Sequence, residues 1–198
     1  MKAIFGLLLG ALTMASAQTG WSAYTSQEDR FTVAIPAAPQ IEAFTYTTEY
    51  ASKLRARRYT ATDGKTNCIM TVVDMSTTDR APNGHAIEIR GSIQFAATNL
   101  RRTGTVTADH YSELSGVPGQ VLQITLPGGV RKYAGIYVLN KRLYIMEATT
   151  PAGVTAPPLL YLSSLIFRDE KGMGLRFMDN NYSFPDGRPP PVDAEAGQ

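Results

Sequence analysis

The chain has 198 residues, of which 43% are hydrophobic and 18% are charged, with 19 Lys and Arg against 17 Asp and Glu. A domain of this length builds a hydrophobic core without disulfides or a structural metal, and its apolar fraction is too high for a chain that is disordered throughout. A formal net charge of +2 excludes the strongly basic composition of a dedicated nucleic-acid binder. We therefore expect one folded domain without a nucleic-acid partner.

The first seventeen residues have the pattern of a secretory signal peptide. Lys2 supplies the charged start, an apolar run from Ala3 to Leu12 follows, and Ala15-Ser16-Ala17 forms an A-x-A cleavage site. The apolar run is shorter than the ~20 residues of a membrane span, and no later segment reaches that length. Residues 1–17 are thus predicted to be removed, which predicts a soluble protein that is periplasmic or secreted. The alternative is an uncleaved N-terminal anchor.

The segment that follows, residues 21–50, has the alternation of antiparallel strands. Phe31, Val33 and Ile35 alternate with Thr32 and Ala34, as expected for a half-buried strand. Residues 41–50 alternate less regularly but are rich in Thr, Tyr and Phe, which favour strands.

Two more strands are predicted on either side of Asp63-Gly64, a pair that favours a tight turn. The first covers residues 53–62, and the second contains the apolar run Cys68–Val73, which is typical of a buried strand. Cys68 is the single Cys of the chain, so an internal disulfide is excluded. We expect its thiol to be buried and to pack like a small hydrophobic side chain; the alternative is a catalytic or dimer-forming thiol.

The second half of the chain contains two predicted helices with strands between them. Apolar residues recur at helical spacing within residues 85–104, and a shorter helix begins at Pro157-Pro158. The stripe of the first helix consists of Ile89, Ile93, Ala97 and Leu100, and that of the second consists of Leu159, Leu162 and Ile166. The order of elements implies an α+β fold in which helices pack on an antiparallel sheet. We expect one domain over residues 18–184 and a disordered Pro-rich tail over residues 185–198.

Several of these motifs resemble small exported bacterial proteins of the PsbP-like type. The opening Trp21-x-x-Tyr24-x-Ser26 and the run from Phe31 to Pro39 are similar to the start of that family, and Arg131–Tyr137, Leu143–Ala148 and the closing helix to Phe167 are similar to its second half. The resemblance implies an α/β/α sandwich around an antiparallel sheet. It also implies a non-catalytic role, because the best-known members are extrinsic subunits of the photosynthetic oxygen-evolving complex. A photosystem role is not implied, since nothing in the sequence marks a photosynthetic membrane.

The common catalytic signatures are absent from the sequence. It contains no G-x-S-x-G, H-E-x-x-H, P-loop or G-x-G-x-x-G motif. The two histidines, His85 and His110, have no partner at zinc-ligand spacing, so we expect neither a metal nor a cofactor. An active site would have to combine scattered polar residues such as Asp109, His110, Glu147 and a Tyr. The competing interpretation is a solvated strand face for Asp109 and a hydrated or paired carboxylate for Glu147.

The main candidate for a binding surface is a row of cations on the strand over residues 53–62. Lys53, Arg55 and Arg57 occupy alternate positions, which places them on one face of that strand, and Tyr59 continues the face. Such a row binds phosphate, carboxylate or an acidic partner, and its replacement is expected to weaken binding without unfolding the protein. The competing interpretation is a solvated face that acidic residues balance.

These observations together predict an exported, soluble, non-catalytic binding or accessory protein of the cell envelope. Its expected partner is an envelope protein or an anionic ligand. The alternative is a small periplasmic hydrolase or lyase with a non-standard active site, in which several scattered polar side chains meet in one pocket.

Cleavage at the predicted site would make Gln18 the first residue of the mature protein, because the small side chains of Ala15 and Ala17 satisfy signal peptidase. Intact-mass measurement of the exported protein is expected to show the loss of residues 1–17. A mass that retains residues 1–17 would contradict the argument for a soluble protein.

Overall fold

The computed structural model describes residues 20–76, 85–154 and 156–175. Its largest element is a seven-stranded antiparallel sheet with the strand order β3-β4-β5-β9-β8-β7-β6. The strands are β3 (Gln40–Thr47), β4 (Lys53–Thr62), β5 (Asn67–Asp74), β6 (Thr105–Leu114), β7 (Val117–Thr125), β8 (Arg131–Leu139) and β9 (Arg142–Thr150). The chain leaves this sheet after the inner strand β5, and it re-enters as β6, which forms the edge of the sheet farthest from β3.

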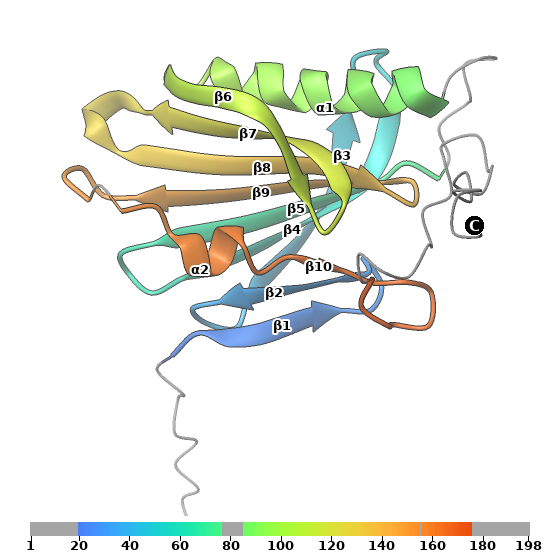
Figure 1. Ribbon diagram of the computed structural model, residues 1–198, viewed down its shortest axis with the longest axis horizontal. Helices are drawn as coiled ribbons and strands as arrows, with labels where there is room; N and C mark the ends of the chain where they lie inside the picture. The colour runs from blue at the N-terminus through green and yellow to red at the C-terminus, as the bar shows by residue number, and fades with distance from the viewer. Residues whose placement is uncertain (1–19, 77–84, 155, 176–198) are drawn as a thin grey trace, which may run out of the picture.

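The two faces of the large sheet carry different layers. Helix α1 (His85–Arg101) lies on one face. The other face carries a small antiparallel sheet, in which β1 (Ser22–Ser26), β2 (Phe31–Ile35) and β10 (Ile166–Phe167) have the order β1-β2-β10, and the short helix α2 (Leu159–Leu162). A single 3-10 turn, η1 (Pro127–Gly129), connects β7 to β8. Figure 1 shows α1 above the large sheet and the small sheet with α2 below it.

Aromatic rings fill the space between the two sheets. Phe31 of β2 meets Tyr59 of β4 edge to face with ring centroids 5.1 Å apart, and Phe167 of β10 meets Tyr144 of β9 at 5.2 Å. All four rings are buried. Large aromatic side chains in this geometry contribute strongly to core stability, so these contacts fix the small sheet on the large one.

The apolar stripe of α1 builds the second core, on the opposite face of the large sheet. Ile93, Ala97 and Leu100 of the helix are buried against strand residues that include Leu122 and Ile136. The predicted helix over residues 85–104 is therefore present, although it ends at Arg101.

The predicted α+β class, with its PsbP-like α/β/α sandwich, is wrong. The fold is β-rich, with 54% strand and 14% helix, and the second outer layer is mainly a sheet. The predicted second helix ends after one turn at Leu162, and Ile166 lies in β10, where it pairs with Thr32 of β2.

Two serine side chains lie at the end of the second helix. The Oγ atoms of Ser163 and Ser164 donate to the carbonyls of Leu159 and Tyr161 at 2.7 Å each, and the backbone N–H groups of the two serines donate to the same carbonyls. Ser164 Oγ also accepts from the backbone N–H of Ala34 at 2.8 Å, so the chain continues along β2 as a strand.

Some of the sequence predictions concern residues outside the described part of the chain. The predicted signal peptide over residues 1–17 and the predicted tail over residues 185–198 both lie there, and the predicted domain over residues 18–184 is described from residue 20 to residue 175. Within the described ranges, no helix is long and apolar enough to cross a bilayer.

Cys68 is expected to react with thiol reagents only when the protein unfolds. It lies in β5 with 1% of its surface exposed, and its thiol is free. Burial, with a smaller effect of Asp63, raises the pKa of this thiol to about 12, so the reactive thiolate is scarce at neutral pH. Labelling with a chromogenic disulfide at pH 8, with and without urea, measures this difference. Equal labelling rates in the two solutions would contradict the burial of Cys68.

Candidate functional site

The predicted row of cations lies on the face of β4 that is turned toward the small sheet. Lys53 and Arg55 are exposed, Arg57 is half-buried, and Tyr59 is buried. The row therefore runs from solvent into the core between the two sheets. The four side chains share one strand face, as the alternation predicts, but they do not form one exposed surface.

Arg57 and Tyr59 both bind the carboxylate of Asp29, which lies in the turn between β1 and β2 and is 3% exposed. Arg57 donates from Nε to Oδ2 at 2.7 Å and from Nη2 to Oδ1, and Tyr59 Oη donates to Oδ2. Ser26 Oγ hydrogen-bonds Tyr59 Oη at 3.0 Å, and Glu28 pairs with Arg57 from the solvent side. Burial and then the hydrogen bond to Asp29 raise the pKa of Tyr59, so the phenol stays protonated as a donor. This network connects β4 to the small sheet.

The two outer cations have other surroundings. Arg55 Nη2 binds Asp74 Oδ2 at 3.0 Å, and the Arg55 side chain is 83% exposed. Lys53 forms no ion pair with any residue in the described ranges. The binding prediction for the row therefore stays a prediction. Lys53 and Arg55 face solvent, whereas the half-buried Arg57 and the buried Tyr59 bind Asp29.

The scattered polar residues do not converge on one pocket. Asp109 Oδ2 accepts from Arg101 Nε at 2.7 Å, and this hydrogen bond lowers the pKa of Asp109. Glu147 binds Lys132 Nζ at 2.6 Å across β8 and β9. His110 is exposed, and strand alternation places its side chain on the opposite face of β6 from Asp109. In the described ranges, no group of three or more His, Cys, Asp and Glu residues is arranged to hold a metal.

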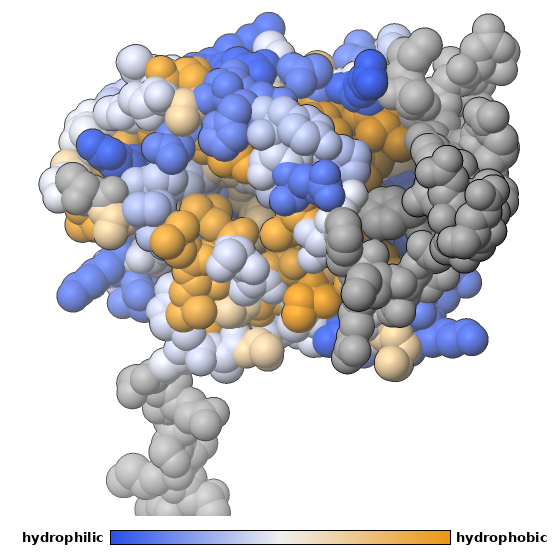
Figure 2. Space-filling view, in the orientation of Figure 1, coloured by the Kyte–Doolittle hydropathy of each residue, from blue (hydrophilic) through white to orange (hydrophobic). Residues whose placement is uncertain are grey.

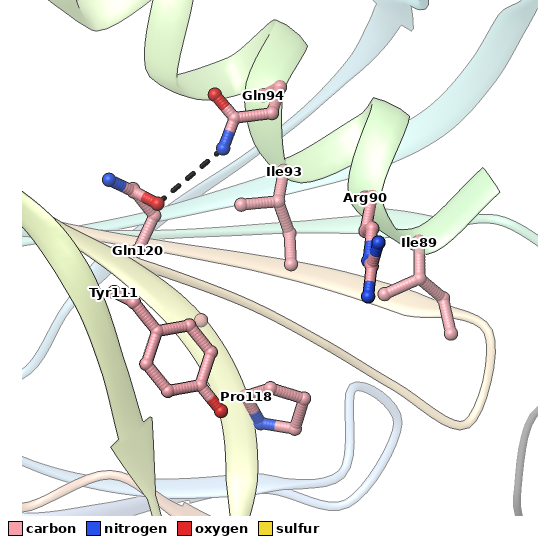
Figure 3. A pocket seen from close by; sticks show the side chains of 8 residues that line it. Ile89, Arg90, Ile93, Gln94, Tyr111, Pro118 and Gln120 are labelled. Carbon is pink, nitrogen blue, oxygen red and sulfur yellow. Dashed lines mark hydrogen bonds between the residues drawn. The ribbon is translucent and has the colours of Figure 1, made fainter. Parts of the chain in front are cut away.

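A hollow of about 510 Å³ lies between α1 and the hairpin formed by β6 and β7. Its lining consists of Ile89, Arg90, Ile93, Gln94, Tyr111, Pro118, Gly119 and Gln120. Figure 3 shows the first four reaching down from α1, with the rings of Tyr111 and Pro118 opposite them on the hairpin. Figure 2 shows apolar surface below the right-hand half of α1, beside this hairpin.

The register of β6 and β7 explains the floor of the hollow. Tyr111 lies opposite Gln120, so both side chains are on the face that is turned toward α1. Gly119 allows the hairpin to lie close to β8, because a Cβ atom there would come within 2.3 Å of the Tyr137 ring and 2.4 Å of the Ile136 carbonyl oxygen. A larger residue at position 119 would push β7 away from β8.

Polar side chains occur at two places in the hollow. At one, Gln94 Nε2 donates to Gln120 Oε1 at 3.5 Å, and Gln120 Nε2 donates to Asp109 Oδ1, so both amides belong to a hydrogen-bonded chain. At the other, Arg90 is exposed, and it forms no ion pair with any carboxylate of the described residues.

Sequence reasoning missed the hollow because Ile89 and Ile93 fit the apolar stripe of a helix that faces a core. Only Ile93 is fully buried, while Ile89 is half-buried and lines the hollow. The available signal was on the strands: Tyr111, which is 66% exposed, and Pro118 place two bulky rings on a surface that alternation predicts to be polar.

No family model and no curated protein matches this chain. It is similar to a solved structure from Bacteroides thetaiotaomicron VPI-5482 at 12% identity and a TM-score of 0.44, over 78% of this chain and 50% of that one. It is also similar to a protein of unknown function from Pseudomonas aeruginosa at 13% identity and a TM-score of 0.30, over 67% of this chain and 83% of that one. The chain thus spans half the length of the Bacteroides structure. The resemblance to PsbP-like proteins stays a prediction.

Replacing Arg57 is expected to destabilise the protein much more than replacing Arg55. Arg57→Ser leaves the buried carboxylate of Asp29 without a cation, which we expect to lower the free energy of unfolding by about 3 kcal/mol. Arg55→Ser, the matched control, removes an exposed pair with Asp74 and is expected to cost less than about 1 kcal/mol. Urea unfolding of both variants measures the difference, and equal values would contradict the structural role given to Arg57.

Proposed function

We propose that this protein is an exported, soluble, non-catalytic binding or accessory protein of the cell envelope, and that it binds a small ligand in the hollow between α1 and the β6–β7 hairpin. The hollow carries the proposal: its volume of about 510 Å³ lies in the range of small-molecule sites, and its lining combines apolar walls with a few polar groups. The predicted signal peptide over residues 1–17 supports a periplasmic or secreted location.

The composition of the lining favours binding over catalysis. Among the described residues that line the hollow, Tyr111 and Arg90 carry the only titratable side chains, whereas a hydrolase or lyase needs a nucleophile or a general base within reach of its substrate. The carboxylate of Asp109 is hydrogen-bonded to the lining residue Gln120, and Arg101 holds its other oxygen. These contacts support a site that holds a ligand without transforming it.

A bulky side chain placed in the hollow is expected to abolish ligand binding without affecting the fold. Gln94 lines the hollow from an exposed position on α1, so Gln94→Trp puts an indole ring into the space. Asn99 is exposed on the same helix and does not line the hollow, so Asn99→Trp is the matched control. Ligand-observed NMR with a library of small aromatic and aliphatic compounds tests both variants against the unmodified protein.

We expect the unmodified protein and Asn99→Trp to bind the same compounds, Gln94→Trp to bind none of them, and every bound compound to be recovered chemically unchanged. Binding that survives in Gln94→Trp would place the site elsewhere. Conversion of the compounds by the unmodified protein would favour the hydrolase or lyase alternative.

A further inference from the structure

Arg90 is the only charged side chain among the described residues that line the hollow. Figure 3 shows it pointing from α1 toward the hairpin, between Ile89 and Ile93 and above Pro118. The guanidinium group is a planar donor that binds a carboxylate through two parallel hydrogen bonds. The hollow therefore contains a cation with its donors unused by the described chain and with apolar side chains on both sides.

The carboxylates around the hollow do not neutralise Arg90. Asp109, on the floor strand β6, is bound by Arg101 and Gln120. Glu113 of β6 lies opposite Pro118 of β7. Glu49 lies close to α1, because its Oε1 is 2.8 Å from the point where a Cβ atom on Gly91 would lie. Neither forms an ion pair with Arg90, so no carboxylate of the described residues compensates the positive charge of Arg90 in the hollow.

The rest of the lining fits an uncharged body. Ile89 and Ile93 form one wall, and the rings of Tyr111 and Pro118 form the other. Apolar walls bind hydrocarbon by removing its surface from water, and the flat aromatic ring of Tyr111 stacks well against another aromatic ring. The amides of Gln94 and Gln120, which bond to each other, add no charge at their end of the hollow.

We infer that the hollow binds a small carboxylic acid with a single ring or a short hydrocarbon chain, that Arg90 holds the carboxylate, and that Ile89, Ile93, Tyr111 and Pro118 contact the body. This inference rests on the proposed function of the hollow and names the chemical class of its ligand. A short body is required because the volume of about 510 Å³ lies toward the lower part of the range for ligand sites.

Isothermal titration calorimetry with two matched pairs of probes tests the inference: phenylacetate against phenylacetamide, and hexanoate against hexanamide. Each pair keeps the body and changes only the charge. We expect each acid to bind at least about tenfold more tightly than its amide, because a hydrogen-bonded charge pair is worth about 1.5 kcal/mol or more.

Arg90→Gln is expected to remove the preference for the acids, with the binding of the amides unchanged. Arg102→Gln, at an exposed arginine just beyond the end of α1, changes the net charge equally and is expected to keep the preference. If acids and amides bind the unmodified protein equally, or if both arginine variants lose the preference equally, the assignment of Arg90 is overturned.

Gln94→Trp separates that failure from a failure of the proposed function. Amides that bind the unmodified protein but not Gln94→Trp would show that the hollow is a binding site even where the acids have no advantage. If no acid or amide binds the unmodified protein, the ligand class inferred here is overturned, and a negative library screen against the same protein overturns the hollow as a site.

Discussion

The bond between Arg57 and the buried carboxylate of Asp29 is the interaction on which the arrangement of the two sheets depends. Removing a carboxylate from water is costly, and the cost is offset only when its oxygens are fully bonded. Asp29 meets this condition through a two-point contact with Arg57 and a hydrogen bond from Tyr59, both supplied by β4. Tyr144 Oη of β9 also donates to the Asp29 carbonyl at 3.1 Å. The β1–β2 turn is therefore held by two strands of the large sheet at once.

With the small sheet held on one face, α1 is the only helix of the described residues that packs on the other face of the large sheet. Seven strands at about 4.8 Å spacing give a sheet about 30 Å wide, whereas a helix is about 10 Å in diameter and its 17 residues extend about 25 Å. One helix cannot cover such a face. The β6–β7 hairpin at the edge of the sheet stands partly clear of α1, and the hollow between them follows from this mismatch.

The sequence predicts the local elements and misses the contacts between distant segments. Alternation locates β2, and a continuous apolar run locates β5. Asp63 and Gly64 lie in the turn between β4 and β5, in which Asp63 Oδ1 accepts from Thr66 N at 2.7 Å. Two features have no local signal: the pairing of β10 with β2, and the choice of Asp29 as the partner of Arg57 from 28 residues away. The hollow combines one helix with one hairpin, and its sequence signal is limited to the bulky rings of Tyr111 and Pro118 on the strands. Periodicity reports which face of an element is apolar, but it does not report which layer covers that face.

The arginines of this protein show why the surroundings of a charge matter more than its place in a pattern. Arg55 and Arg57 are two positions apart on one strand, yet the exposed Arg55 pairs with Asp74 at the surface, whereas Arg57 is held by a buried carboxylate. Arg90 differs from both, because it lies among apolar side chains and no described carboxylate pairs with it. An ion pair is stronger where apolar groups displace water from around it. An anion that brings its own hydrocarbon body into the hollow would displace that water, so the apolar walls and the unpaired cation act on the same ligand.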